Sequence, residues 1–234
     1  MTLIVETILC RPKTMDNYSY LITDKETDIS AVIDPSEAEP IIARCQKLNL
    51  KPSYILSTHH HFDHTQGNAE LKKLFNLKVI GAEKRIPEVD IILNPGDSFY
   101  IGKTKGEMID VSAHTYGHVV WHFPDNRLLF TGDTLFNLCI GGLFEGNIKN
   151  MFNALEKIKS LPNETLFYPG HEYTLQAIPF ALKHCNNEAL VEYIKTAERR
   201  LSRNIPSHPV ALGAEKECNP YLIAATFETF ENLF

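Results

Sequence analysis

The chain has 234 residues, of which 44% are hydrophobic, so it can build one large domain or one domain with a small second one. Its net charge of −6 and its lack of a Lys/Arg run argue against a nucleic-acid or anionic-membrane partner. No apolar run approaches the ~20 residues of a membrane helix, and no signal peptide is visible. Five scattered cysteines without a CxxC pair favour a reducing, cytoplasmic location.

The first part of the chain mixes predicted strands with two helices. Alternating and β-branched runs predict strands over residues 3–10, 18–22, 29–33, 53–57 and 78–80. Asp34-Pro35-Ser36 is expected to end the third strand and to cap a helix over about 38–48. A second helix is expected over about 66–76, directly after a His-rich loop.

The second part returns to strands and then becomes helical. Further strands are predicted over residues 98–101, 107–112, 119–123, 127–130 and 165–168, with a helix over 149–159. The last predicted helices cover residues 175–184, 188–203 and 219–230. Two sets of strands with helices between them indicate an α/β (α+β) sandwich of two sheets covered by helices. The switch to helices places a domain boundary between residues 171 and 172.

The most informative stretch is the loop after the strand at 53–57, which reads Thr58-His59-His60-His61-Phe62-Asp63-His64. Side chains two positions apart in an extended loop point the same way, so His59 and His61 can bind one cation. Asp63 and His64 lie just beyond and can reach a second, harder cation. The alternative is a polar loop with chance histidines, but four ligand-type residues within six positions favour metal binding.

This loop resembles the signature of the metallo-β-lactamase superfamily, and the triple His with Gly67-Asn68 resembles its glyoxalase II branch, the hydroxyacylglutathione hydrolases. Gln66 stands where that branch usually has Gly. The resemblance implies an αββα sandwich with a C-terminal helical domain. Residues 1–171 would then form the metal-binding catalytic domain and residues 172–234 a helical substrate-binding domain.

Three more segments resemble motifs of this superfamily, and each follows a predicted strand. They are Ser112-Ala113-His114-Thr115-Tyr116-Gly117-His118, Thr131-Gly132-Asp133 and Gly170-His171-Glu172-Tyr173-Thr174. The resemblance assigns His59, His61, His114 and Asp133 to one metal. It assigns Asp63, His64, Asp133 and His171 to the other, with Asp133 as the bridge. His118 is expected to support the ligands through hydrogen bonds rather than to bind metal.

Such a site would hold two divalent transition-metal ions, zinc as the first expectation and iron or manganese as alternatives. Water between the ions loses a proton near neutral pH, and the resulting hydroxide attacks a carbonyl whose oxygen a metal polarises. Asp63 and Asp133 are therefore the expected catalytic carboxylates. The resemblance makes a small-molecule thioester the expected substrate, as in the hydrolysis of S-D-lactoylglutathione to D-lactate and glutathione.

The expected substrate contacts are Tyr173 and Phe144, which lie in segments that resemble the branch. Glutathione carries two carboxylates, and the branch grips them with basic residues. At the matching positions this chain has Gly142, Glu228 and Glu231. These replacements predict weak binding of glutathione thioesters, unless a cation from elsewhere substitutes. The candidates for that substitute are Lys183, Lys216 and Arg203.

Several rival functions share the fold. A mononuclear-iron persulfide dioxygenase would share several ligands, but such chains usually end sooner after the last His. Another thioester or lactone hydrolase of the superfamily would keep the full ligand set. A tRNA-processing nuclease would need a basic surface, and a metal-free binding module would have lost ligands.

Overall fold

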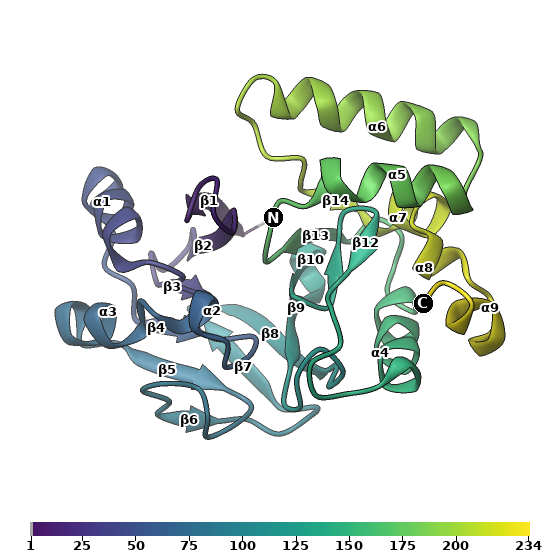
Figure 1. Ribbon diagram of the computed structural model, residues 1–234. Coiled ribbons are helices and arrows are strands. Elements are labelled where there is room, and N and C mark those ends of the chain that lie inside the picture. The colour runs from purple at the N-terminus through teal and green to yellow at the C-terminus, as the bar shows by residue number, and fades with distance from the viewer. Residues whose placement is uncertain (1) are drawn as a thin grey trace. The chain divides into compact units, whose positions relative to one another are not determined.

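The computed structural model describes residues 2–234, which divide into two compact units (Figure 1). The first unit runs to Asp110 and includes Gly117–Asn126, and the second combines Val111–Tyr116 with Arg127–Phe234. The described residues form two six-stranded sheets and one two-stranded sheet.

The first sheet belongs entirely to the first unit and has the order β1-β2-β3-β4-β5-β6. Its strands β1 to β3 are antiparallel, whereas β3 to β6 are parallel. The strands are β1 (Leu3–Cys10), β2 (Asn17–Asp24), β3 (Ser30–Ile33), β4 (Tyr54–Leu56), β5 (Lys78–Gly81) and β6 (Ile91–Ile92). Parallel strands need long crossovers, which here contain α1 (Ala38–Leu48), α2 (Phe62–Thr65) and α3 (Asn68–Phe75).

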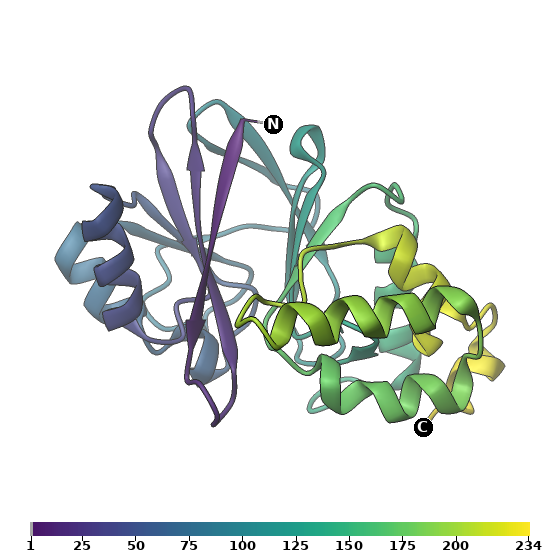
Figure 2. The ribbon, with the colours of Figure 1, turned by 90° about the horizontal axis from the view of Figure 1, so that it is seen from above.

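Helices α1 and α3 cover one face of this sheet (Figures 1 and 2). Buried Ile41 and Cys45 of α1 and Leu71 of α3 share one apolar cluster with Ile55 and Val79 of the sheet. Residues three or four apart on a helix lie on one face, so each helix presents a stripe to the strands. This packing holds the end of β4, from which the His-rich loop departs, in a fixed place.

The first unit also holds an antiparallel set of three strands. They are β7 (Ser98–Ile101), β8 (Thr104–Asp110) and β9 (Val119–Phe123), followed by the short helix η1 (Pro124–Asn126). Every residue of β9 is buried, and the ring of Trp121 packs edge-on against that of Phe99, with ring centroids 5.1 Å apart. These strands end close in sequence to His114 and His118, so the strand ends deliver the second His motif.

The second unit contains β10 (Leu128–Gly132), which pairs in parallel with β13 (Leu166–Pro169), and β14 (Val210–Ala211), antiparallel to β13. A small hairpin joins β11 (Leu135–Phe136) to β12 (Cys139–Ile140). The helices are α4 (Ile148–Lys159), α5 (Thr174–His184), α6 (Glu188–Leu201), α7 (Leu212–Cys218), α8 (Pro220–Ile223) and α9 (Phe227–Glu231). Helices α5 and α6 lie side by side in both ribbon views (Figures 1 and 2).

Two predicted helices are wrong in detail. The helix expected over 66–76 begins at Asn68, and the helix expected over 219–230 is split into α8 and α9. Asn219 and Thr226 each accept a hydrogen bond from a backbone N–H in the turn that follows, so each starts a new helix. Helix α7 was not predicted, because its seven residues are too few to show a clear period.

The capping role expected for Asp34 is also wrong. Helix α1 has Glu37 at its N-cap and receives no side-chain cap. Asp34 instead has a left-handed backbone, with φ of 46°, and its carboxylate turns toward the His-rich loop. None of the helices in residues 2–234 combines the length and the hydrophobicity that a membrane span requires.

Candidate metal centre

The His-rich loop brings its candidate ligands together within the first unit. The ring centroids of His59 and His61 are 4.7 Å apart, and those of His59 and His64 are 4.3 Å apart. The Oδ2 atom of Asp63 lies 3.4 Å from Nε2 of His64. His59, Asp63 and His64 are buried, so desolvation would favour a cation that pairs with their lone pairs. The loop therefore brings together four side chains that can bind a transition metal.

Asp34 orients two parts of this loop. Its Oδ1 accepts a hydrogen bond from the backbone N of Thr58 at 2.7 Å, and its Oδ2 accepts from Thr58 Oγ1 at 2.6 Å. The same Oδ2 lies 3.1 Å from Nδ1 of His64. A carboxylate can only accept here, so His64 carries its proton on Nδ1 and presents the Nε2 lone pair. This carboxylate–histidine arrangement is typical of metal-ligating histidines.

Thr58 fixes the tautomer of His59 in a similar way. Its hydroxyl proton goes to Asp34, so its oxygen is left to accept from Nδ1 of His59, 3.0 Å away. His59 therefore also presents Nε2. Three oxygen and nitrogen contacts thus set the tautomers of two neighbouring imidazoles before any metal binds.

Asn17 holds Asp63 in place. Its Nδ2 donates to the backbone oxygen of Asp63 at 3.0 Å and to its Oδ2 at 2.9 Å.

Gly67 follows the loop where the chain passes very close to Pro35. A Cβ on Gly67 would lie 2.9 Å from the Pro35 oxygen, which already accepts from the Gly67 N–H at 2.8 Å. A side chain at position 67 would therefore clash with Pro35, which explains the glycine in the Gly67-Asn68 pair.

The second unit gathers His114, Asp133 and His171. The Oδ2 of Asp133 lies 3.6 Å from Nε2 of His114 and 3.3 Å from Nε2 of His171. These separations are longer than ordinary N–H···O bonds and suit ligand atoms arranged around cations. Nδ1 of His114 is 2.7 Å from the carbonyl oxygen of Gly142, so His114 also presents Nε2. One carboxylate oxygen therefore faces two imidazoles, as a bridging ligand would.

The loop that supports His114 is tightly fitted. A Cβ on Gly141 would lie 1.8 Å from the backbone oxygen of Asp133, so any side chain there would displace that residue. Phe144 follows in the same loop, 71% exposed, with its ring 5.0 Å from that of His114. Tyr173 stacks on His171 with centroids 4.7 Å apart. Both predicted substrate contacts thus lie directly beside candidate ligands.

Two other histidines of the motifs have different surroundings. His118 is fully buried and stacks on His59 at 4.6 Å, beside a candidate ligand. Nδ1 of His60 lies 2.8 Å from Oε1 of Glu83, a carboxylate outside the candidate ligand set. The supporting role of His118 stays a prediction.

Three residues of the site were not predicted as functional: Asn17, Asp34 and Thr58. Asn17 lies in Asp16-Asn17-Tyr18 and Asp34 lies in Asp34-Pro35, two segments that resemble the same places in glyoxalase II proteins, but neither residue was predicted to support a ligand. A buried polar residue at a strand end, upstream of a ligand motif, was the available signal. Its partner could not be read from sequence, because Asp34 is 30 residues from His64.

Family models cover almost the whole chain. The model of the metallo-beta-lactamase superfamily matches residues 15–89 and 81–171, and that of the hydroxyacylglutathione hydrolase C-terminus matches residues 172–230. A hydroxyacylglutathione hydrolase from Pelagibacter ubique (strain HTCC1062) is 44% identical over 222 residues, covering 93% of each chain. One from Rhodospirillum rubrum is 40% identical over 213 residues, covering 89% of this chain and 83% of that protein.

The chain belongs to the hydroxyacylglutathione hydrolase family.

Solved structures confirm the fold that this family implies. The B3 metallo-beta-lactamase BLEG-1 superposes with a TM-score of 0.72 at 21% identity, covering 94% of this chain and 99% of that one. ETHE1 from Myxococcus xanthus gives a TM-score of 0.74 at 22% identity, covering 98% and 89%. The predicted αββα sandwich with a C-terminal helical region is therefore confirmed.

As a member of the hydroxyacylglutathione hydrolase family, the protein is a glyoxalase II-like binuclear metallohydrolase. Its His- and Asp-containing clusters are consistent with the two-metal site of the superfamily. The three Nε2 atoms presented by His59, His64 and His114 fit such a site, because neutral imidazole is a common metal ligand.

Proposed function

We propose that this protein hydrolyses the thioester bond of S-D-lactoylglutathione or a related small thioester, releasing the acid and the thiol. The observation that carries the proposal is the 44% identity over 93% of the chain to a protein named hydroxyacylglutathione hydrolase. The presence of all seven candidate ligands supports it.

In this proposal the seven ligands bind two ions. One ion takes His59, His61, His114 and Asp133, and the other takes Asp63, His64, Asp133 and His171. The mixture of imidazole and carboxylate suits zinc, iron or manganese, and zinc is our first expectation. A similar structure, TTHA1623, was solved in a di-iron-bound form and is 28% identical over 71% of this chain, with a TM-score of 0.63, which supports iron as an alternative.

The protein's own groups would divide the work as follows. Two divalent ions at this site would lower the pKa of a water molecule and polarise the thioester carbonyl. Asp133 would neutralise part of their charge and set their spacing. Asp63, held by Asn17 through two hydrogen bonds, would orient the water and take its proton. Asp34 and Thr58 would keep His64 and His59 in the tautomers that bind metal.

We further propose that Phe144 and Tyr173 contact the substrate and that residues 172–234 form a substrate-binding domain after the catalytic residues 1–171. The exposure of Phe144 beside His114 and the stacking of Tyr173 on His171 support these roles. A cytoplasmic location is also proposed. It is supported by the five cysteines, all of which are free thiols.

The thiol half of the substrate is where this chain departs from its family. Gly142 has no side chain to offer, and Glu228 and Glu231 lie exposed on α9. Carboxylates at these positions would repel the carboxylates of glutathione. Lys216 has another task, because its Nζ donates to the Leu161 oxygen and to Asn163 Oδ1. We therefore propose a raised KM for glutathione thioesters with little change in kcat.

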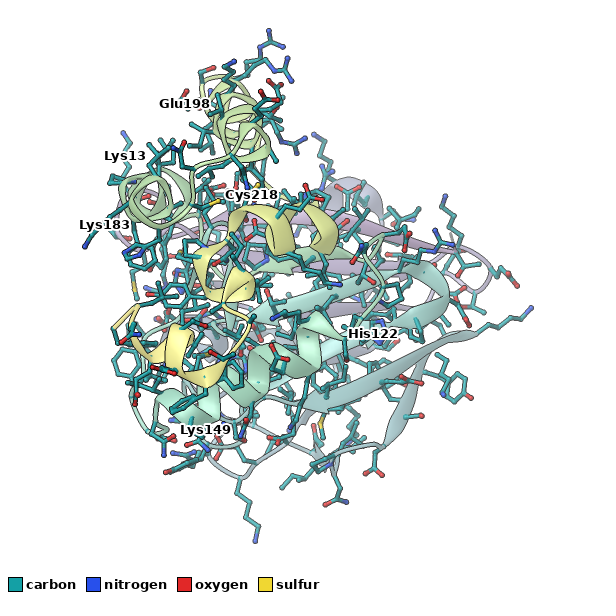
Figure 3. All side chains as sticks on the ribbon, turned by 90° about the vertical axis from the view of Figure 1, so that its right-hand side faces the viewer. Lys13, His122, Lys149, Lys183, Glu198 and Cys218 are labelled. Atoms are coloured by element: carbon teal, nitrogen blue, oxygen red, sulfur yellow. The ribbon has the colours of Figure 1, made fainter. Side chains whose placement is uncertain are left out.

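Steady-state kinetics with S-D-lactoylglutathione and a panel of uncharged thioesters tests this proposal. The expected result is hydrolysis of both classes, with a higher KM for lactoylglutathione. The double variant Glu228→Arg/Glu231→Lys should lower that KM by about two- to tenfold, as two exposed charge contacts allow. Its matched control is Glu198→Lys on α6, labelled in Figure 3, which should leave the KM unchanged.

Two results would contradict the proposal. A lower KM for lactoylglutathione than for the uncharged thioesters would show that another cation grips the thiol half. Metal-loaded protein that cleaves no thioester, but oxidises a persulfide with one iron per chain, would replace the hydrolase by a dioxygenase.

A further inference from the structure

A cavity of about 340 Å³ opens in the helical part of the second unit, and the metal ligands do not line it. Its lining comes from α6, including Glu192, Tyr193 and Ala197, from Ser207 and Val210, and from α7, including Glu217. Cys218 is labelled at α7 in Figure 3. The volume lies at the lower end of the range of small-molecule sites, so the cavity can hold a ligand of a few carbon atoms.

The lining of the cavity is apolar with acidic groups. Alanines from both helices, Val210 and the Tyr193 ring provide apolar surface. Burial raises the pKa of the Cys218 thiol to about 12, so that thiol is neutral at pH 7. Glu192 and Glu217 are exposed and negatively charged, and no Lys, Arg or His is among the described residues that line the cavity. A small molecule with an apolar body and one positive charge complements this surface.

The first connection from the cavity to the metal ligands runs through Tyr193. Its hydroxyl donates to Glu215, whose Oε2 accepts from the backbone N of Leu138 at 3.0 Å. Leu138 lies in the hairpin after Phe136, and the ring centroids of Phe136 and His171 are 5.7 Å apart. A ligand that moves the Tyr193 ring would therefore bear on the hairpin beside His171.

The second connection runs through Ser207. Its backbone N donates to Oε2 of Glu172 at 2.9 Å and its hydroxyl donates to Oε1 at 2.8 Å. Glu172 directly follows His171 in the chain. The segment is fixed to α6 as well, because Arg200 donates to the oxygens of Pro206 and His208 at 2.7 and 2.8 Å. The wall of the cavity and the turn that carries His171 are thus joined by short hydrogen bonds.

We propose that this cavity is an effector site for a small primary amine with a short apolar chain, and that its occupancy changes metal binding at His171. The amine would place its chain against the alanines and its ammonium group between Glu192 and Glu217. The cavity lies outside the proposed catalytic machinery, so the proposal goes beyond the thioesterase activity and does not require it. By linkage, metal at His171 must change amine affinity by the same factor as the amine changes metal affinity.

Isothermal titration calorimetry of the full chain with hexylamine, hexanol and hexanoate tests the site. Hexylamine should bind at least about tenfold more tightly than hexanoate, as a charge-assisted contact allows. Glu192→Gln/Glu217→Gln should abolish this preference, whereas the matched control Glu198→Gln on the same helix should keep it. Ala197→Leu, which places a larger side chain in the cavity, should weaken binding. If Ala197→Leu fails to fold, the exposed Glu192→Gln/Glu217→Gln variant still tests the site.

Titrations with zinc-loaded and metal-free protein test the connection. The expected difference in hexylamine affinity is about fivefold, the lower end of typical coupling between sites. Tyr193→Phe should reduce this difference while leaving binding in place. Equal affinities for hexylamine and hexanoate, unchanged binding in Ala197→Leu, or equal affinities with and without zinc would each overturn the proposal. None of these readouts requires thioester turnover, so a failed activity assay would leave them interpretable.

Discussion

Two buried polar clusters of this molecule can be compared, one around His64 in the first unit and one around Glu215 in the second. Around His64, Asp34 and Thr58 take up the Nδ1 sides of two imidazoles and leave the Nε2 sides presented. Around Glu215, the carboxylate accepts from the Tyr193 hydroxyl, the Leu138 N–H and Asn219 Nδ2. The first cluster therefore prepares donors for a ligand, and the second closes upon itself.

The difference separates a cluster that presents ligand atoms from one whose hydrogen bonds join neighbouring elements of the fold. The hydrogen bonds of the closed cluster around Glu215 join α6, α7 and the β11–β12 hairpin. Changes in this cluster should therefore alter stability. Changes in a cluster that presents lone pairs to a metal should alter metal content and activity before stability. Three experiments would break or sharpen this contrast.

The largest effect is expected for Asp133→Ala. This change removes the one carboxylate oxygen that faces both His114 and His171. We expect loss of metal and a loss of activity well above the roughly 10–100-fold that follows removal of a supporting partner. Elemental analysis and thioester hydrolysis would measure both, and His59→Ala and His171→Ala should each lose mainly one ion. Full activity in Asp133→Ala would show that the proposed bridge is wrong.

A smaller effect is expected for Asp34→Asn, because this residue touches a ligand rather than a metal. The amide holds the Nδ1 proton of His64 less strongly, so metal affinity should fall by about 10–100-fold. Competition with a chelator would measure it. Asp90→Asn is the matched control, since Asp90 accepts from Val79 N at 2.9 Å and pairs with Lys72 and Lys78 instead. Equal losses in both variants would reduce Asp34 to an ordinary fold-stabilising carboxylate.

The smallest effect on metal content and activity is expected for the closed cluster, where the change concerns folding stability and its dependence on pH. Burial raises the pKa of Glu215 to about 7, despite the hydrogen bonds from Tyr193, Asn219 and Leu138 that oppose the shift. Its ordinary value is 4.5. Between these values the folded state binds one proton more than the unfolded state, so the free energy of unfolding falls as pH rises. The contribution is complete below pH ~4.5 and is lost through pH ~7, by roughly 3 kcal/mol.

Urea unfolding of the wild type and Glu215→Gln at several pH values would measure this contribution. Metal-free protein should be used for both, because metal binding to histidines also depends on pH. The wild type should lose stability relative to the variant as pH rises from 5 to 8. Parallel curves for the two proteins would mean that Glu215 stays ionised in the fold.

The sequence alone predicted the candidate metal ligands and most of the fold. His59, His61, Asp63 and His64 lie within six positions, so adjacency in the chain reveals them without any tertiary information. Strands and long helices were predicted because their periods repeat over many residues. The motifs around His114, Asp133 and His171 were predicted from their resemblance to motifs of the metallo-β-lactamase superfamily.

The tertiary structure decided which residues support the ligands and where the polar core lies. Asp34 meets His64 across 30 residues, Asn17 meets Asp63 across 46, and Leu138 meets Glu215 across 77. Helices as short as α7, α8 and α9 depend on single capping groups rather than on a repeating pattern. Local sequence carries propensity and period, but the partner of a buried polar group is chosen only when distant strands and helices pack together.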